Sequence, residues 1–222
     1  MSFSCISPID GRVVCEREHA TREEIGLAVE RANAAQKEWR RVPLKERVAR
    51  LGSFVDAVLD RAEDFARELT LQIGRPISHS PYEIKGGFQE RARHMLSIAE
   101  SALADVQGPE TPGFRRFVRK EPHGTVFVMA AWNYPWLIAV NSVAPALAAG
   151  NTVLLKHSAQ TPLVSEGFAA GMEAAGLPKG VFGILHLNHQ EALDLAADKR
   201  IGHVVLTGSV EAGHVVRGAT AK

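Results

Sequence analysis

The sequence contains few cysteines, and this scarcity excludes several classes of protein. Only two occur in 222 residues, Cys5 and Cys15. A disulfide-rich secreted scaffold is therefore excluded, and the spacing of this pair does not fit a metal-ligand motif. We expect free thiols in a reducing compartment, with a Cys5–Cys15 disulfide as the less favoured alternative.

Long apolar runs and net charge are lacking as well. No stretch is long and apolar enough to span a membrane, and the N-terminus lacks the basic start and apolar run of a secretory signal. A net charge of +1 gives no reason to expect nucleic acid or an acidic membrane surface as a partner. The nine histidines are scattered without a metal-binding pattern, so no metal site is predicted. We expect a cytoplasmic protein of ordinary globular composition.

The first hundred residues predict a short strand pair followed by helices. Residues 4–7 and 12–15 alternate around a turn at 8–11. Thr21 and Glu24 form a capping box that opens a helix reaching Trp39. An apolar stripe from Leu44 to Ile73 then predicts one helix of about eight turns. A third helix is predicted over residues 81–105.

A turn-rich break at residues 108–113 precedes a basic, alternating stretch from Phe114 to Glu121. This stretch is predicted to be an exposed strand. Two interpretations are open: an edge strand protected from aggregation by its charges, or a strand that pairs with another subunit.

From residue 125 onwards, strand and helix patterns alternate. Apolar runs begin near residues 125, 152, 181 and 203, and helical patterns cover about 136–149, 163–175 and 189–197, with another beginning near 210. Continuous apolar runs are typical of parallel strands covered on both faces. The alternation predicts right-handed crossovers and an α/β fold with a doubly wound parallel sheet.

Three of these strands end in residues that suit a binding site. Asn133 follows the strand ending at Ala131, Lys156 ends the next strand, and the turn Gly208–Gly213 follows the strand near 203. Ligands bind at the carboxyl ends of strands in such sheets. Each feature also has an ordinary explanation: an Asx-turn for Asn133, a lysine that only reaches solvent for Lys156, and a tight turn for Gly208.

Other polar and aromatic residues are expected to have structural roles. Trp132 and Trp136 are interpreted as loop anchors, and His157 as a loop residue. Glu166 and Glu191 are expected on the solvated faces of helices.

Taken together, the motifs resemble the NAD(P)-dependent aldehyde dehydrogenase superfamily over essentially the whole chain. The resemblance implies a helical part of the cofactor domain over residues 1–106, an oligomerisation arm over 107–121 and a Rossmann-like NAD(P)-binding core over 122–222. It rests on the order of Trp132-Asn133-Tyr134-Pro135, the segment Pro145–Lys156, Gln160-Thr161-Pro162-Leu163, the segment Ala175–Val181 and the turn Thr207–Gly213.

The resemblance also implies a reaction and residue roles. In the family, a cysteine thiolate attacks an aldehyde, hydride passes to NAD or NADP, and a glutamate-activated water releases the acid. A homodimer or homotetramer is implied for the full-length protein. By the resemblance, Asn133 stabilises the oxyanion, and Lys156 binds the adenosine ribose of the cofactor. Gly208 and Ser209 approach the pyrophosphate, and Gly213 allows close helix packing. The other implied cofactor residues are Trp132, Ser158 and Ala159.

Two departures from the family pattern stand out. Many members have a glutamate at the position of Ala159 that grips the ribose hydroxyls. Alanine here therefore implies that the site tolerates NADP, and a preference for NADP over NAD is the further alternative. The family's nucleophile and base follow the turn at Gly208, so we expect them to lie outside this sequence and the chain alone to be inactive. Neither Cys5 nor Cys15 has the nucleophile's context.

Three interpretations of function follow. The first is the N-terminal portion of an aldehyde dehydrogenase. The resemblance of Leu154–Ser158 to a branch that includes semialdehyde-oxidising enzymes implies succinate semialdehyde as substrate. The second is a non-catalytic dinucleotide-binding or assembly module, although the incomplete sheet argues against independent stability. A reductase with the usual Gly-x-Gly-x-x-Gly turn is disfavoured because that turn is absent from the sequence.

Overall fold

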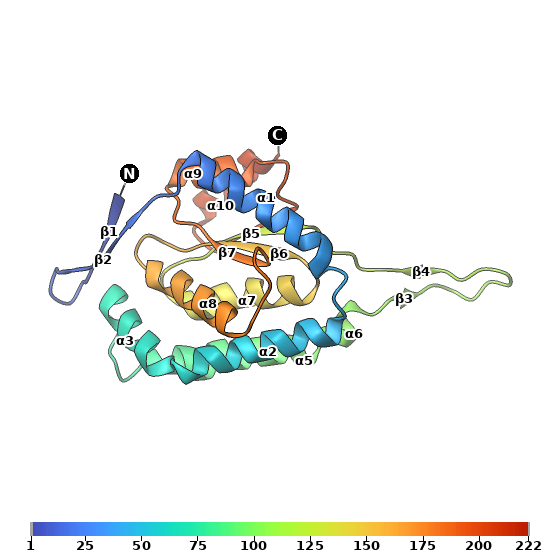
Figure 1. The fold of residues 1–222 in the computed structure, drawn as a ribbon, viewed down its shortest axis with the longest axis horizontal. Helices are drawn as coiled ribbons and strands as arrows, with labels where there is room; N and C mark the ends of the chain where they lie inside the picture. The colour runs from blue at the N-terminus through green and yellow to red at the C-terminus, as the bar shows by residue number, and fades with distance from the viewer. Residues whose placement is uncertain (1, 222) are drawn as a thin grey trace.

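A parallel sheet lies at the centre of the computed structural model, which describes residues 2–221 (Figure 1). Its strands lie in the order β7–β6–β5–β8, and every neighbouring pair is parallel. The predicted doubly wound α/β sheet is confirmed. The strand bounds are β5 Thr125–Met129, β6 Thr152–Lys156, β7 Phe182–Ile184 and β8 His203–Leu206.

Helices cover both faces of the sheet. Below it in Figure 1, α7 and α8 lie against the strands, and α2 (Leu44–Asp60) and α5 (Gln89–Ser97) form a further layer beneath them, while α1, α9 and α10 lie above. Among the described residues, no helix is both long enough and apolar enough to cross a membrane. The bounds are α1 Arg22–Trp39, α7 Pro135–Ala148, α8 Pro162–Ala174, α9 His189–Ala196 and α10 Val210–Thr220.

Strand β5 shows how the sheet divides the core. Every residue of β5 is buried. Because side chains alternate along a strand, Val126 and Val128 enter the core shared with α7 and α8, whereas Phe127 and Met129 enter the core shared with α1 and α9. The continuous apolar run therefore serves two separate layers, as expected for a covered parallel strand.

The prediction of one long helix over residues 44–73 is wrong, because the chain forms two helices there. Helix α2 covers Leu44–Asp60 and α3 covers Ala62–Ile73, and Arg61 between them has φ −110° and ψ 13°. The apolar stripe continues across the break, so periodicity alone does not reveal it. The guanidinium of Arg61 lies 4.6 Å from the centre of the Phe65 ring.

The predicted helix over residues 81–105 is also divided. It consists of α4 (Ser80–Tyr82), the π-helix η1 (Glu83–Phe88), α5 (Gln89–Ser97) and α6 (Ala99–Leu103). Wider π turns are often found at functional sites. Here the π turn contains Glu83, a buried acidic residue.

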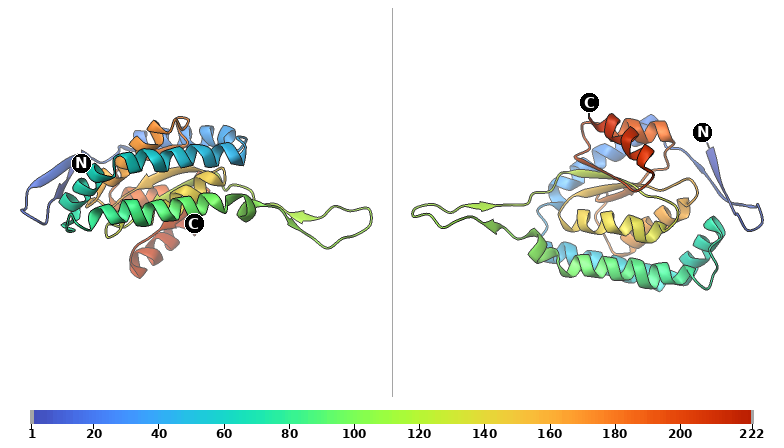
Figure 2. Two further views of the ribbon diagram at one scale, coloured as in Figure 1. Left: turned by 90° about the horizontal axis from the view of Figure 1, so that it is seen from below. Right: turned by 180° about the vertical axis from the view of Figure 1, so that it is seen from behind.

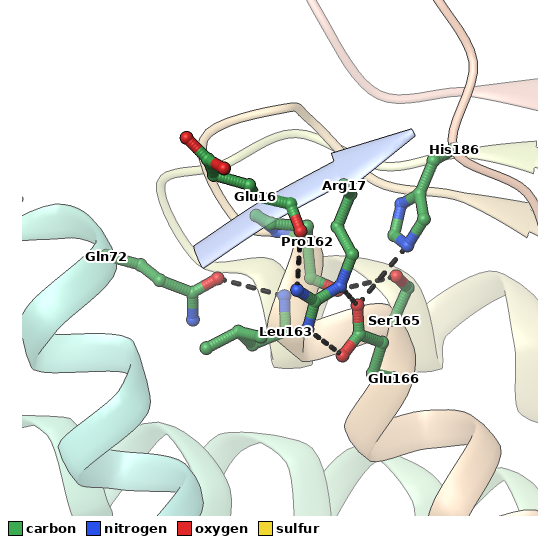
Figure 3. A network of polar contacts seen from close by, with 8 residues as sticks. All are labelled: Glu16, Arg17, Gln72, Pro162, Leu163, Ser165, Glu166 and His186. Carbon is green, nitrogen blue, oxygen red and sulfur yellow. Dashed lines mark hydrogen bonds and ion pairs between the residues drawn. The ribbon is translucent and has the colours of Figure 1, made fainter. Parts of the chain in front are cut away.

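The predicted N-terminal strand pair is confirmed as the antiparallel hairpin of β1 (Ser2–Ile6) and β2 (Val13–Glu18). Arg17 of β2 makes two hydrogen bonds to the carboxylate of Glu166 on α8, and His186 lies 3.3 Å from the same carboxylate (Figure 3). The expectation of a solvated Glu166 is therefore wrong. Burial opposes its ionisation, but Arg17 and His186 lower the pKa of Glu166 to about 2.

The basic stretch from Phe114 to Glu121 is not an edge strand of the main sheet. Only Phe117–Val118 (β4) is a strand, and it pairs antiparallel with Val106–Gln107 (β3). Figures 1 and 2 show this ribbon projecting far beyond the helices. Strand β4 is exposed and lies at the edge of its own two-stranded sheet, outside the four-stranded central sheet, so both interpretations of this stretch stay open.

An aromatic cluster fills the layer between α7, α8 and the N-terminal helices. The fully buried Trp136 lies 4.9 Å from Phe65 and 4.9 Å from Phe168, measured between ring centres. Its predicted role as an anchor is confirmed. A Cβ added at Gly167 would lie 2.8 Å from the Trp136 ring, so this helix position has no room for a larger side chain.

Replacement of Gly167 by alanine should therefore destabilise the fold. We expect Gly167→Ala to lower the free energy of unfolding by about 1–3 kcal/mol, because an overpacked core must shift a rigid ring. The matched control is Gly52→Ala in α2, where an added Cβ meets no atom within 4 Å; helix propensity should make it neutral or stabilising by up to about 1 kcal/mol. Urea unfolding measures both, and equal effects of the two changes would contradict this packing.

Candidate functional site

A cleft of about 1090 Å³ lies at the carboxyl ends of the strands. It is located where the strand order reverses, since β6 and β7 lie on one side of β5 and β8 lies on the other. Open α/β sheets bind ligands at such a switch point. The predicted site residues that line it are Trp132, Asn133, Lys156, Ser158, Ala159, Gly208 and Ser209.

Gly213 does not line the cleft. An added Cβ at Gly213 would meet no atom within 4 Å among the described residues. No described residue packs closely against Gly213, so the close helix packing expected for this glycine stays a prediction. The turn before it does face the cleft, through Gly208 and Ser209.

The loop after β5 presents Asn133 and Trp132 to the cleft. Both are exposed, and Trp132 retains 47% of its accessible surface, so its predicted role as a loop anchor is wrong. The side-chain amide of Asn133 makes no hydrogen bond with any of residues 2–221, whereas its backbone carbonyl accepts one from Arg75. The Asx-turn alternative is thus not observed, and the amide is available to a ligand.

The carboxylate of Glu83 supports this loop through hydrogen bonds and an ion pair. One carboxylate oxygen accepts the backbone N–H groups of Trp136 (2.8 Å) and Leu137 (3.2 Å), in the first turn of α7. The other oxygen pairs with the guanidinium of Arg75, which also donates to the carbonyl of Asn133. Arg75 further lies 4.5 Å from the centre of the Tyr134 ring.

The charge state of Glu83 reflects opposing influences. Burial raises its pKa above the ordinary value, and Arg75 and the two amides oppose this rise. A carboxylate at a helix N-terminus is stabilised by the free N–H groups and the helix dipole. The side chain is only 1% exposed, so loss of one partner would leave a buried polar group uncompensated.

Lys156 ends β6 with its side chain in the cleft. Burial lowers its pKa, and its amine makes no hydrogen bond or ion pair with the rest of the described chain. The next residue, His157, is buried against the aromatic cluster, and burial lowers its pKa to about 3, so it is neutral near pH 7.

The N-terminus of α10 forms another wall. Ser209 is the N-cap, and its hydroxyl accepts the N–H of Ala212 at 3.1 Å. An added Cβ at Gly208 would meet only ordinary contacts at 3.6 Å and beyond, so the chain itself leaves room there. A helix N-terminus with open backbone beside it suits a phosphate group.

Several lining residues were not predicted. Phe3 and His19, whose rings stack 5.0 Å apart, reach the cleft from the hairpin region, and no sequence pattern connects that region to the sheet. Leu187 and Asn188 follow β7. The sequence did contain a signal for the position of Asn188, because Asn188 and Glu191 form a capping box at the start of α9. Glu191 therefore caps this helix, and its assignment to a solvated face is wrong.

The fold and the position of the cleft place the chain in the class of doubly wound α/β proteins that bind ligands at a strand-order reversal. A family model described as the aldehyde dehydrogenase family matches residues 1–222. The chain belongs to the aldehyde dehydrogenase family.

Individual relatives agree with this assignment. The chain is 30% identical over 220 residues to a probable NADP(+) succinate-semialdehyde dehydrogenase of Sinorhizobium fredii, covering 96% of this chain and 44% of that protein. It is 34% identical over 200 residues to a succinate-semialdehyde dehydrogenase of Paenarthrobacter nicotinovorans, covering 87% and 43%. A solved succinate-semialdehyde dehydrogenase from Burkholderia pseudomallei superimposes with a TM-score of 0.93 at 28% identity, covering 100% and 46%. The chain thus spans just under half the length of these relatives.

The role of Glu83 predicts a measurable loss when its charge is removed. Glu83→Gln keeps the shape but leaves Arg75 without its counterion, so we expect the free energy of unfolding to fall by about 1–3 kcal/mol. The Asn133 side-chain amide resonances should also broaden as the loop loses its support. Urea unfolding and NMR of labelled protein measure the two effects.

The matched control is Glu63→Gln. Glu63 pairs with Lys85 on the surface, with both side chains at least half exposed. Exposed pairs contribute little, so this variant should unfold like the wild type. If Glu83→Gln behaved like the control in both measurements, Glu83 would not support the loop.

Proposed function

We propose that this chain supplies the nucleotide cleft and the oxyanion-stabilising amide of an NAD(P)-dependent aldehyde dehydrogenase. One observation carries the proposal: three strand ends bring Asn133, Lys156 and Ser209 to a single cleft. The whole protein would oxidise an aldehyde to a carboxylic acid. The names of its relatives support a semialdehyde as the substrate.

The residues of the cleft fit a dinucleotide. The unpaired amine of Lys156 would donate to the hydroxyls of the adenosine ribose, with Ser158 and Ala159 beside it. Gly208 and Ser209 would face the pyrophosphate at the start of α10. Trp132 would line the cleft nearer to Asn133. When bound, the nicotinamide ring would accept the hydride.

Asn133 would act on the substrate. A free amide donor can stabilise the negative charge that develops on an aldehyde oxygen, and one such donor lowers a barrier by roughly 3–4 kcal/mol. The loop held by Arg75 and Glu83 would keep this donor in place before substrate binds. Preorganisation of this kind removes the energetic cost of orienting the donor during the reaction.

The nucleophile would not come from Cys5 or Cys15. Neither residue lines the cleft, and burial raises the pKa of both thiols. We therefore propose that residues 2–221 alone bind nucleotide without oxidising aldehyde. A non-catalytic dinucleotide-binding module is the second candidate, because the same cleft would serve it.

The projecting ribbon would pair with a second copy of the chain. Its apolar side chains are exposed: Val106 at 54%, Phe114 at 72% and Val118 at 66%. Among residues 2–221, strands β3 and β4 pair only with each other, so each has an outer edge available for further pairing. A homodimer or homotetramer of the whole protein is the proposed assembly, with residues 107–121 as the arm.

Nucleotide preference tests the proposal. The cleft has no carboxylate at position 159 to repel a 2′-phosphate, so we expect NADP to bind at least as tightly as NAD. Ala159→Glu should weaken NADP binding about tenfold, because like charges a few ångströms apart cost roughly 1–2 kcal/mol, and should leave NAD affinity unchanged or raised, because a carboxylate there can accept the ribose hydroxyls. Isothermal titration calorimetry measures all four affinities.

The matched control is Ala104→Glu, which makes the same charge change at an exposed position remote from the lining residues. It should leave both affinities unchanged. If neither nucleotide bound the wild-type chain, the proposed function would be wrong. If NAD bound at least tenfold more tightly than NADP, only the cofactor preference would be wrong.

A further inference from the structure

The two cysteines, which the proposed reaction does not use, face each other across the N-terminal hairpin. Cys5 of β1 is the direct partner of Cys15 of β2 in the antiparallel register. Side chains of directly opposed residues project from the same face of the pair. Both thiols are free in the structure.

The backbone geometry of this pair suits a disulfide. Directly opposed residues in an antiparallel pair have Cα atoms about 4.5–5.5 Å apart. Disulfides join cysteines whose Cα atoms are about 4.4–6.8 Å apart, so the typical separation of opposed residues lies within the range that a disulfide spans. The electrostatics agree with this proximity, because each thiol influences the pKa of the other.

The surroundings fix the hairpin against the body of the molecule. The Arg17–Glu166 pair ties β2 to α8, and His186 contacts the same carboxylate (Figure 3). Cys5 is 1% exposed, and its thiol donates to the backbone carbonyl of Gln160 at 3.3 Å. Cys15 is only half-buried, so a small reagent can reach the pair through it.

We propose that Cys5 and Cys15 are a redox modification site that forms an intramolecular disulfide with a small disulfide such as oxidised glutathione. The thiolate of Cys15, a minor species at neutral pH because burial raises the pKa of this thiol, attacks one sulfur of the reagent, giving a mixed disulfide and one glutathione thiol. The thiolate of Cys5 then attacks Cys15 Sγ and displaces the second glutathione. One disulfide is reduced to two thiols, two cysteines are oxidised to one disulfide, and the two cysteine protons end on glutathione.

Oxidation would change the hydrogen bonding of the loop between β6 and α8. The Cys5 thiol loses its proton in the disulfide and no longer donates to Gln160. The affected peptide group joins Gln160 to Thr161, directly after Ser158 and Ala159, which line the cleft. The hydrogen bond from Cys5 to Gln160 thus connects the redox site to the segment that lines the cleft. This connection does not depend on which ligand the cleft binds.

A glutathione titration tests the proposal on the chain itself. The protein is equilibrated with mixtures of reduced and oxidised glutathione, quenched with an alkylating reagent and analysed by mass spectrometry, in buffer and in concentrated urea. Because the fold holds the thiols together, the equilibrium constant for the intramolecular disulfide should be at least about tenfold larger in buffer than in urea. Equal constants, or thiols that remain alkylatable in buffer at the most oxidising ratio, would overturn the proposal.

Single variants and NMR separate the proposed pair from ordinary thiol reactivity. Cys5→Ser and Cys15→Ser should each yield at most a glutathione adduct and no internal disulfide. In the labelled wild-type protein, oxidation should shift the amide resonance of Thr161, and neither serine variant should reproduce that shift with oxidant. An unchanged Thr161 resonance in the oxidised protein would overturn the link to the loop.

Discussion

The carboxylate of Glu83 joins three segments that lie far apart in the sequence. It accepts the first amides of α7, pairs with Arg75 after α3, and through Arg75 holds the carbonyl of Asn133. Because Glu83 belongs to the π-helix of the N-terminal layer, the helices that cover the sheet also support the loop at the end of β5. Because the Glu83 side chain is only 1% exposed, water cannot take the place of these hydrogen-bond partners.

Much of the fold and of the site could be predicted from local patterns. Continuous apolar runs identified the strands of the sheet, and Asn133, Lys156 and Gly208 followed directly from where those runs end. The break at Arg61 could not be predicted, because the apolar stripe continues through it. Glu83 gave no signal either, since its partners on α7 lie more than fifty residues later.

The structure separates the two kinds of chemistry in the chain. The cleft has a free amide, a desolvated lysine and a helix N-terminus, but neither cysteine lines it. The thiols lie instead in the N-terminal hairpin, where Cys5 donates a hydrogen bond to the loop that carries Ser158 and Ala159. The cleft is therefore suited to binding and to charge stabilisation, and the hairpin to thiol exchange. The chain spans just under half the length of its relatives, so the proposed oxidation belongs to the whole protein.

The most direct test of this account is a crystal structure of the chain with NADP bound. The account predicts that the amine of Lys156 lies within hydrogen-bonding distance of the adenosine ribose, that the pyrophosphate lies at Gly208 and Ser209, and that the nicotinamide points towards Asn133. A nucleotide bound away from the ends of β5, β6 and β8, or in the reverse orientation, would contradict it.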